Sequence, residues 1–319
     1  MEHHLNVKLA LKILKFILIV ASLGTLFYIA FGSIEQLRHY ELHFKSLYLA
    51  AAAFFCILVY LGYAHLWYLI TRSMGIHLPY FLSLRVWVNS QLGKYLPGKV
   101  WMFVGRIFVY SEQGVSVELT SAALIIESVL VFAASIFVFF ISLPVLGFVF
   151  PRYEWALLIL FLLFVYFAFN LKQVEAILNY ILVRLFKRPA IQLLIQTRDF
   201  IKIFIFGCLT VYLSGVFVWF LINSFTDYPL QGLMYLAAAY ALSGFISMLA
   251  IIIPGGIGLQ ESIITWMLKS VFSLNIAAAI SLMVRLLTIC IELLLILSVW
   301  CATKLLRPEM PLKEKVVSK

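Results

Sequence analysis

Charged residues are scarce in this 319-residue chain: Asp, Glu, Lys and Arg make up 12% of it, whereas hydrophobic residues make up 64%. Soluble domains carry roughly a quarter charged residues. This composition excludes the soluble class, because so much apolar surface has no core large enough to cover it. The apolar runs of about 20 residues fit helices across a bilayer, whereas a membrane β-barrel shows short alternating segments. The sequence therefore predicts an all-α integral membrane protein.

Signatures of catalysis and metal binding are also missing. The sequence has no HExxH, no nucleotide P-loop and no acidic DxD pair, and GIGLQE lacks the third glycine of a dinucleotide fingerprint. We therefore expect no enzyme activity, no catalytic residues, no metal and no cofactor. The four cysteines show no CxxC or zinc-ligand spacing and are interpreted as small core residues. They are Cys56, Cys208, Cys290 and Cys301.

Six full membrane spans follow from length and apolarity. Two further apolar segments, 79–110 and 229–272, are each interrupted by a Pro-Gly pair, and we interpret them as broken, re-entrant helical hairpins. The first span follows three lysines and resembles a signal peptide, but it is longer than the usual apolar core of one, which favours a retained helix. The six spans are 11–32, 46–70, 117–142, 153–169, 200–223 and 276–303.

The net charge of +10 is explained by orientation rather than by nucleic-acid binding, because Lys and Arg lie mainly at the ends of the predicted spans. With the N-terminus inside, the inside connections hold fifteen Lys and Arg residues and the outside connections hold three. The positive-inside rule then predicts a multi-pass membrane protein with both termini in the cytoplasm.

This orientation makes 46–142 and 200–303 inverted repeats within a single domain, 1–303, followed by a basic tail, 304–319. The span after each break begins at a similar distance, 20 residues after Pro97 and 22 residues after Pro254. Interrupted helices at matching positions of two inverted halves mark the substrate site of many transporters. We therefore expect the two breaks to meet at a hydrated chamber in the middle of the protein.

The first break places basic side chains beside a helix start. Lys94 and Lys99 flank Pro97-Gly98, and Arg85 stands in the polar stretch before them. A helix beginning after Pro97 would direct free N–H groups toward the break, and with the lysines these groups form a candidate phosphate cradle. The alternative is that both lysines extend to the lipid headgroups and only anchor the hairpin.

The second break is rich in glycine. Gly255, Gly256 and Gly258 follow Pro254 and permit close approach of backbone to a ligand or a neighbouring helix. Glu261 then falls in the first turn of the next helical arm. A carboxylate at that position is either a helix-end stabiliser or a functional group, and the sequence leaves both interpretations open.

Three ionisable residues lie deep in apolar spans: Glu127, Arg285 and Glu292. Such groups are costly in a membrane unless paired, and they mark pathways or structural pairs. Arg285 and Glu292 are seven residues apart and share a helix face. Because Glu127 and Arg285 follow their breaks by 30 and 31 residues, we expect them to pair across the repeat interface, as a structural lock or as a coupling or gating pair.

At QLGKYLPGKVW (91–101) and PGGIGLQE (254–261) the chain resembles the lysylphosphatidylglycerol synthase transmembrane-region family, the flippase-like domain. Members fused to a synthase domain move an aminoacylated lipid between leaflets, and stand-alone members are associated with polysaccharide or glycolipid assembly. A short tail after 303 implies a member without aminoacyl transfer. The site residues that the resemblance implies are Lys94, Tyr95, Pro97, Gly98, Pro254, Gly255, Gly256, Gly258 and Glu261.

These observations favour a translocase for an anionic membrane lipid or lipid-linked sugar, serving cell-envelope or polysaccharide assembly. Membrane lipids and envelope-biosynthesis enzymes are the expected partners, and nucleic acid is not. One alternative is a non-transporting scaffold for a glycosyltransferase complex. A second is an intramembrane enzyme acting on a lipid phosphate, for which the sequence offers no nucleophile or metal constellation.

Overall fold

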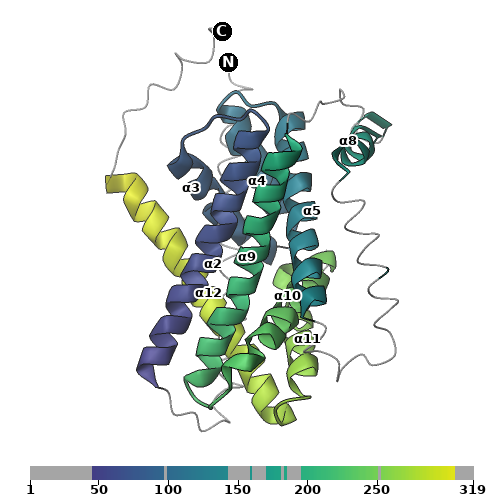
Figure 1. Cartoon of the computed structure of the whole chain (residues 1–319). Helices are drawn as coiled ribbons and strands as arrows, with labels where there is room; N and C mark the ends of the chain where they lie inside the picture. Colours follow the sequence, from purple (N-terminus) through teal and green to yellow (C-terminus); the bar gives the residue numbers. More distant parts are fainter. Residues whose placement is uncertain are drawn as a thin grey trace.

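The computed structural model describes residues 45–96, 99–142, 159, 170–180, 183–184, 195–250 and 253–305 (Figure 1). All regular structure in these ranges is helical. The longer helices are α2 (Ser46–Ser73), α5 (Val117–Ile141), α9 (Thr197–Asn223), α10 (Leu233–Leu249) and α12 (Leu274–Leu305). The shorter ones are α3 (Tyr80–Ser90), η1 (Gln91–Tyr95), α4 (Val100–Glu112), α8 (Leu171–Tyr180), η3 (Leu230–Gly232), η4 (Pro254–Gly256) and α11 (Leu259–Leu268).

Within the part of the chain that the structure describes, five helices are long and apolar enough to cross a membrane. Four of them, α2, α5, α9 and α12, match predicted spans, because an uninterrupted apolar run of this length fixes a helix from sequence alone. The fifth candidate, Leu230–Leu249, is the first arm of the second predicted hairpin. The predicted span 11–32, the predicted span 153–169 except residue 159, the residues Pro97 and Gly98, and the tail beyond 305 lie outside the described residues.

Helices α2 and α9 run antiparallel at the centre of the bundle. The Lys45 N–H, just before α2, donates to the Ser224 carbonyl, just after α9, at 2.6 Å, and Lys45 Nζ lies 2.7 Å from Asp227 Oδ1. Gly62 lets the two helices approach closely, since a Cβ there would lie 2.9 Å from Thr210 Cγ2. Small residues at such crossings are typical of membrane helices, whose association depends on close packing.

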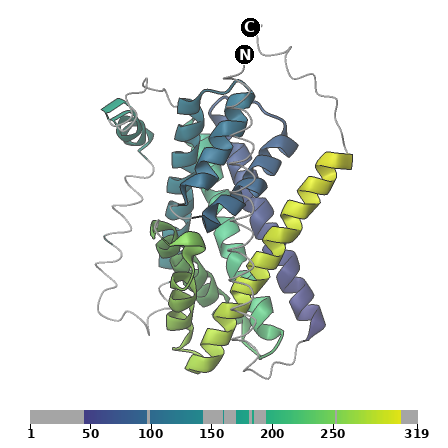
Figure 2. The same cartoon turned by 180° about the vertical axis from the view of Figure 1, so that it is seen from behind.

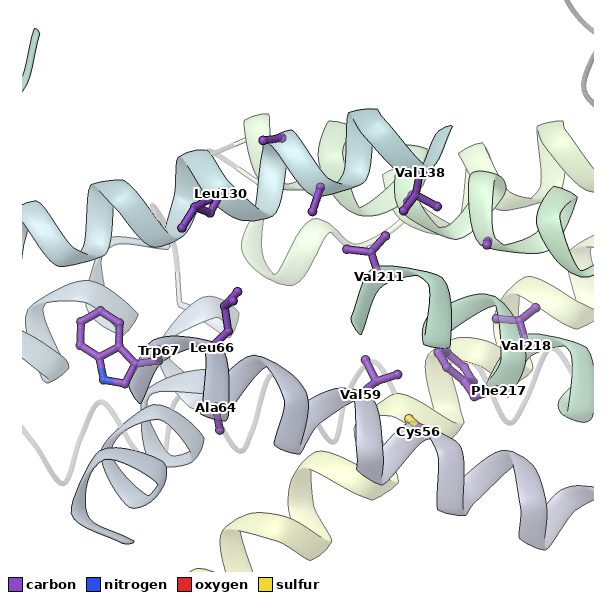
Figure 3. Close-up of a cluster of buried hydrophobic side chains, with 14 of the residues drawn as sticks. Cys56, Val59, Ala64, Leu66, Trp67, Leu130, Val138, Val211, Phe217 and Val218 are labelled. Atoms are coloured by element: carbon purple, nitrogen blue, oxygen red, sulfur yellow. The ribbon is translucent and has the colours of Figure 1, made fainter. Parts of the chain in front are cut away.

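The hydrophobic core fills the space between α2, α5 and α9. Leu66 on α2, Leu130 on α5 and Val211 on α9 are at most 1% exposed and lie in this layer (Figure 3). The cysteine interpretation is correct for Cys56, which is buried in the core, and wrong for Cys290 and Cys301, which are exposed. The apolar run around these two residues could not reveal which helix face points outward.

The two broken hairpins enter the bundle from opposite ends (Figures 1 and 2). Helices α3 and α4 lie at the end where α2 finishes, and α10 and α11 lie at the end where α9 finishes. Helix α4 packs on α5, and α11 packs on α12. The tips of the hairpins, η1 and η4, contact each other. The tips of the two hairpins therefore meet, as the sequence predicted.

A short amphipathic helix, α8, forms within the connection between α5 and α9. Lys172 is exposed on it, as the helical spacing of apolar and charged residues in this segment predicts. Residues 185–194 of the same connection lie outside the described residues.

Candidate functional site

The tips of the two hairpins touch through Tyr95 and Gly255. Gly255 has φ 58°, and a Cβ added to it would lie 2.9 Å from Tyr95 Cδ1 and 3.0 Å from Arg285 Nη2. Both the left-handed backbone and the lack of space require glycine at this position. The Arg285 guanidinium also lies over the Tyr95 ring, 5.9 Å from its centroid. The glycine-rich break thus serves close approach of one hairpin to the other.

Glu292 on α12 joins three elements through its carboxylate. Tyr60 on α2 donates to Oε1 at 2.5 Å, Tyr95 on η1 donates to Oε2 at 2.6 Å, and Lys94 forms an ion pair with Oε1. The Glu292 side chain is 2% exposed, so these contacts replace water that burial removes. The first hairpin tip is therefore fixed to α12 by one charged and one phenolic donor, and α2 is joined to the same carboxylate by a second phenol.

Lys99 ties the first break to the second hairpin. Its ammonium donates to the Ser247 carbonyl on α10 at 2.5 Å. The residue is the N-cap of α4 and has φ 52°, a left-handed conformation that is uncommon for a side chain other than glycine or asparagine. The predicted start of α4 at the break is therefore confirmed, and its capping residue is held across the hairpin interface.

A second buried ion pair lies between α4 and α5. Arg106 Nη1 lies 2.5 Å from Glu127 Oε2, and Arg106 Nε donates to Ser90 Oγ at 2.8 Å. Trp87 Nε1 donates to the other oxygen, Glu127 Oε1, at 2.8 Å. The guanidinium of Arg106 is also stacked between two indole rings, with 4.9 Å to the Trp67 centroid. Arg106 is 1% exposed, and four neighbouring groups fix its position: Glu127, Ser90, Trp67 and Trp87.

Arg285 takes its partners from the second hairpin. It donates from Nη2 to the Gly255 carbonyl at 3.0 Å and from Nη1 to Gln260 Oε1 at 3.3 Å. Its Nε lies 3.3 Å from Glu261 Oε1, so the two side chains form an ion pair. This contact is not a hydrogen bond, because Arg285 Nε has no hydrogen-bond partner. Glu261 Oε2 has none either. Glu261 is thus an ion-pair partner of α12 rather than a cap of α11.

The predicted pair between Glu127 and Arg285 is wrong. Each binds the helix that follows the break in its own half: Glu127 binds Arg106 on α4, and Arg285 binds Glu261 on α11. Glu127 and Arg285 do each lie on the long helix that follows the break in its own half, as the spacing predicted. Partner choice depends on how α4 and α11 pack against the next helix, which spacing along the chain does not encode.

A cavity of about 240 Å³ lies beside these contacts, in the middle of the bundle. Both hairpins contribute to its wall: Lys94 and Arg106 come from the first, and Gly244 and Gln260 come from the second. A Cβ at Gly244 would meet no atom within 4 Å, consistent with open space at that point of the wall. Most of the remaining lining residues have aromatic, polar or aliphatic side chains. Among them are Tyr60, Tyr63, Trp87, Gln91, Phe103, Glu127, Ser128, Ser135 and Tyr240.

The family model described as lysylphosphatidylglycerol synthase TM region matches residues 12–296. The chain belongs to this family. It is therefore a multi-pass membrane domain of a family that is associated with a lipid-related, flippase-like function. No curated protein matches the chain.

The structure of this family member brings most predicted site residues to one place. Lys94 lines the cavity, while Tyr95, Lys99, Gly255 and Glu261 form the contacts around the hairpin tips. Gly256 packs against α10, where a Cβ would lie 1.7 Å from Ser247 Oγ, and Gly258 (φ 77°) precedes α11. Arg85 on α3 is half-buried, and it does not belong to the cavity wall that the described residues form. Pro254 begins η4.

Several residues of this site carried no distinct signal in the sequence. Tyr60, Trp87 and Tyr240 belong to the 16% of residues that are aromatic, so nothing separates them from core or interface side chains. Gln91 and Gln260 were better marked, because an amide stands out in an apolar segment beside a break. Polar residues near helix breaks are therefore the useful signal, and aromatic residues are not.

The site gathers opposite charges around the two breaks. Four basic side chains lie around the breaks with three carboxylates, an excess of one positive charge: Lys94, Lys99, Arg106 and Arg285 with Glu127, Glu261 and Glu292. In the part of the chain that the structure describes, no group of three His, Cys, Asp or Glu residues is placed to hold a metal ion. The cavity presents two cations and two amides, donors that match phosphate oxygens.

Proposed function

We propose that this protein is a flippase-like translocase that moves the anionic headgroup of a membrane lipid or lipid-linked sugar across the bacterial inner membrane. One observation carries the proposal: a cavity with Lys94 and Arg106 in its wall lies where two broken hairpins from opposite ends of the bundle meet. Broken helices that meet at the centre of the membrane are a recurring solution for substrate sites in transporters.

The running directions of the helices support inverted repeats over 46–142 and 200–303. Helices α2 and α12 run toward the end of the molecule that holds α3 and α4, and α5 and α9 run away from it (Figure 1). Each half thus consists of a long helix, a hairpin and a second long helix, in opposite orientations. With 11–32 and 153–169 as further spans, six full spans result. The excess of Lys and Arg in one set of connections supports an orientation with both termini in the cytoplasm.

In this proposal the protein moves its substrate without changing a covalent bond. The headgroup binds at the cavity through Lys94 and Arg106, and the second break with Glu261 forms the corresponding site after the halves rock against each other. The protein is then not an enzyme, and it works in a downhill or gradient-coupled direction. Lipids of the cell envelope or of polysaccharide assembly are its substrates, and envelope enzymes are its protein partners.

Reconstitution tests this proposal directly. The purified chain is placed in liposomes with fluorescent phosphatidylglycerol or a labelled polyprenyl-phosphate sugar, and dithionite reports how fast the label changes leaflet. We expect the protein to accelerate exchange of at least one of the two. Failure with both lipids, by protein that is folded, contradicts the proposal and favours the scaffold alternative.

Two glycines provide a matched pair for the cavity. A Cβ at Gly244 or at Gly105 meets no atom within 4 Å, but Gly244 lines the cavity and Gly105 is exposed on α4. Leucine improves helix propensity at both sites by a similar amount. We expect Gly244→Leu to reduce lipid exchange to the rate of empty liposomes and Gly105→Leu to retain it. Equal rates in the two variants would exclude this cavity as the route.

A further inference from the structure

Lys94 stands between two environments. Its amine is paired with Glu292, whose side chain is 2% exposed, while the Lys94 side chain is 24% exposed and forms part of the cavity wall. An ammonium group has three donors. Lys94 is therefore a cation that an incoming anion can reach from the cavity.

Glu292 does not depend on Lys94 alone. If the ammonium left, Tyr60 and Tyr95 would still donate to the two carboxylate oxygens at 2.5 and 2.6 Å. A carboxylate with two phenolic donors keeps a hydrogen bond on each oxygen, which limits the penalty of losing its counter-ion. The reverse does not hold: Lys94 leaving Glu292 needs another anion, because an unpaired ammonium in a membrane interior is costly.

Arg106, the other cation in the cavity wall, is held differently. It is 1% exposed, paired with Glu127, hydrogen-bonded to Ser90 and stacked between Trp67 and Trp87. The cavity thus has one fixed positive charge and one whose flexible side chain can change partner. Arg106 therefore keeps its partners, whereas Lys94 can exchange one partner for another.

We propose that Lys94 exchanges partners during transport: a phosphate-bearing headgroup entering the cavity takes its ammonium from Glu292, and this removes the ion pair that joins the first hairpin tip to α12. Glu292 is then an intramolecular competitor of the substrate, and the halves remain latched when the cavity holds no anion. This inference rests on the proposed function, since it assumes that the cavity binds an anionic headgroup.

The test uses binding of dihexanoyl phosphatidylglycerol and of inorganic phosphate to the full chain in detergent micelles. Glu292→Gln removes the competing charge and keeps an acceptor for one tyrosine hydroxyl, while its NH2 group can donate to the other. We expect it to bind the lipid about tenfold more tightly than the wild type, within the range of couplings between linked equilibria. Tightening for the lipid alone identifies a headgroup site, and tightening for both ligands identifies a general phosphate site; each supports the exchange.

Asp227→Asn is the control, because it also removes the carboxylate of a lysine ion pair, the one between Lys45 and Asp227, and neither of these residues lines the cavity. Its affinity should stay close to that of the wild type. Lys94→Met should weaken binding, and Lys94→Met combined with Glu292→Gln should bind no more tightly than Lys94→Met alone, because the competitor acts only through the lysine. If Glu292→Gln does not fold, Glu292→Asp, which shortens the side chain, should tighten binding to a smaller extent.

The outcomes separate the two proposals. If the wild type binds and moves lipid but removing Glu292 leaves affinity unchanged or weaker, the exchange is wrong and the translocase stands. Equal tightening by Asp227→Asn and Glu292→Gln would also overturn the exchange, since it would show a general electrostatic effect. If folded wild type and all variants bind no anion and move no lipid, the translocase proposal fails, and the exchange fails with it.

Discussion

The ring of Tyr95 rests on Gly255, so the tips of two hairpins separated by about half the chain are in direct contact. This contact leaves no room for a Cβ on Gly255, and the neighbouring Arg285 closes the other side. The two breaks therefore do more than interrupt helices. They let two stretches of backbone approach at the point where the charged contacts of both halves are gathered.

Replacing Gly255 by alanine should weaken this contact. Alanine is strained in the left-handed backbone conformation by about 1–2 kcal/mol, and its Cβ must also displace Tyr95. Gly258→Ala is the control, since φ at Gly258 is 77° and no atom lies within 4 Å of the added Cβ. We expect Gly255→Ala to lower the thermal midpoint in detergent clearly more than Gly258→Ala. Equal effects would mean that backbone conformation alone requires glycine at the tip.

The pair of Arg106 and Glu127 should be sensitive to loss of one partner. Glu127→Gln leaves the Arg106 guanidinium, 1% exposed, without its counter-ion, and we expect a loss of about 3 kcal/mol or more in unfolding free energy. The double variant Arg106→Met with Glu127→Met should be less destabilised, because no buried charge remains. Denaturant unfolding in micelles measures both. A double variant that is worse than the single one would show that the pair itself supplies net stability.

Two substitutions at Lys99 separate its side chain from its backbone. Lys99→Ala and Lys99→Gly both lose the hydrogen bond to the Ser247 carbonyl, but only glycine accepts φ 52° without strain. We expect the glycine variant to be more stable than the alanine variant by about 1 kcal/mol. Thermal unfolding of the two proteins checks this difference, and the opposite order would show that the left-handed conformation is not retained in the variants.

Lipid exchange should depend on Lys94 and not on positive charge in general. Lys94→Met removes a cation from the cavity wall, whereas Lys202→Met removes an exposed one on α9 that lies 3.5 Å from Asp199. We expect the first variant to reduce the exchange rate in proteoliposomes at least tenfold, about 1.4 kcal/mol in the barrier, and the second to keep the wild-type rate. Similar losses in both would indicate a requirement for net charge instead of a site.

Long apolar runs were sufficient to find α2, α5, α9 and α12, because a helix is the only structure in which a single uninterrupted segment satisfies its own backbone in lipid. The breaks at Pro97 and Pro254 were equally visible, since Pro and Gly are rare in such runs and lysines or glycines surround them. The sequence also predicted that Arg285 and Glu292 share a buried face, and the structure confirms it at 6% and 2% exposure.

The partners of the buried charges were decided only by the tertiary structure. From spacing alone, Glu127 and Arg285 matched each other, yet each binds a residue of the preceding arm in its own half, and Glu292 binds Lys94 from the opposite half. Hydrophobic length and helix-breaking residues act locally, so the chain encodes them in short stretches. Which of several buried acids meets which base depends instead on the packing of helices that are distant in sequence, and only their arrangement in space settles it.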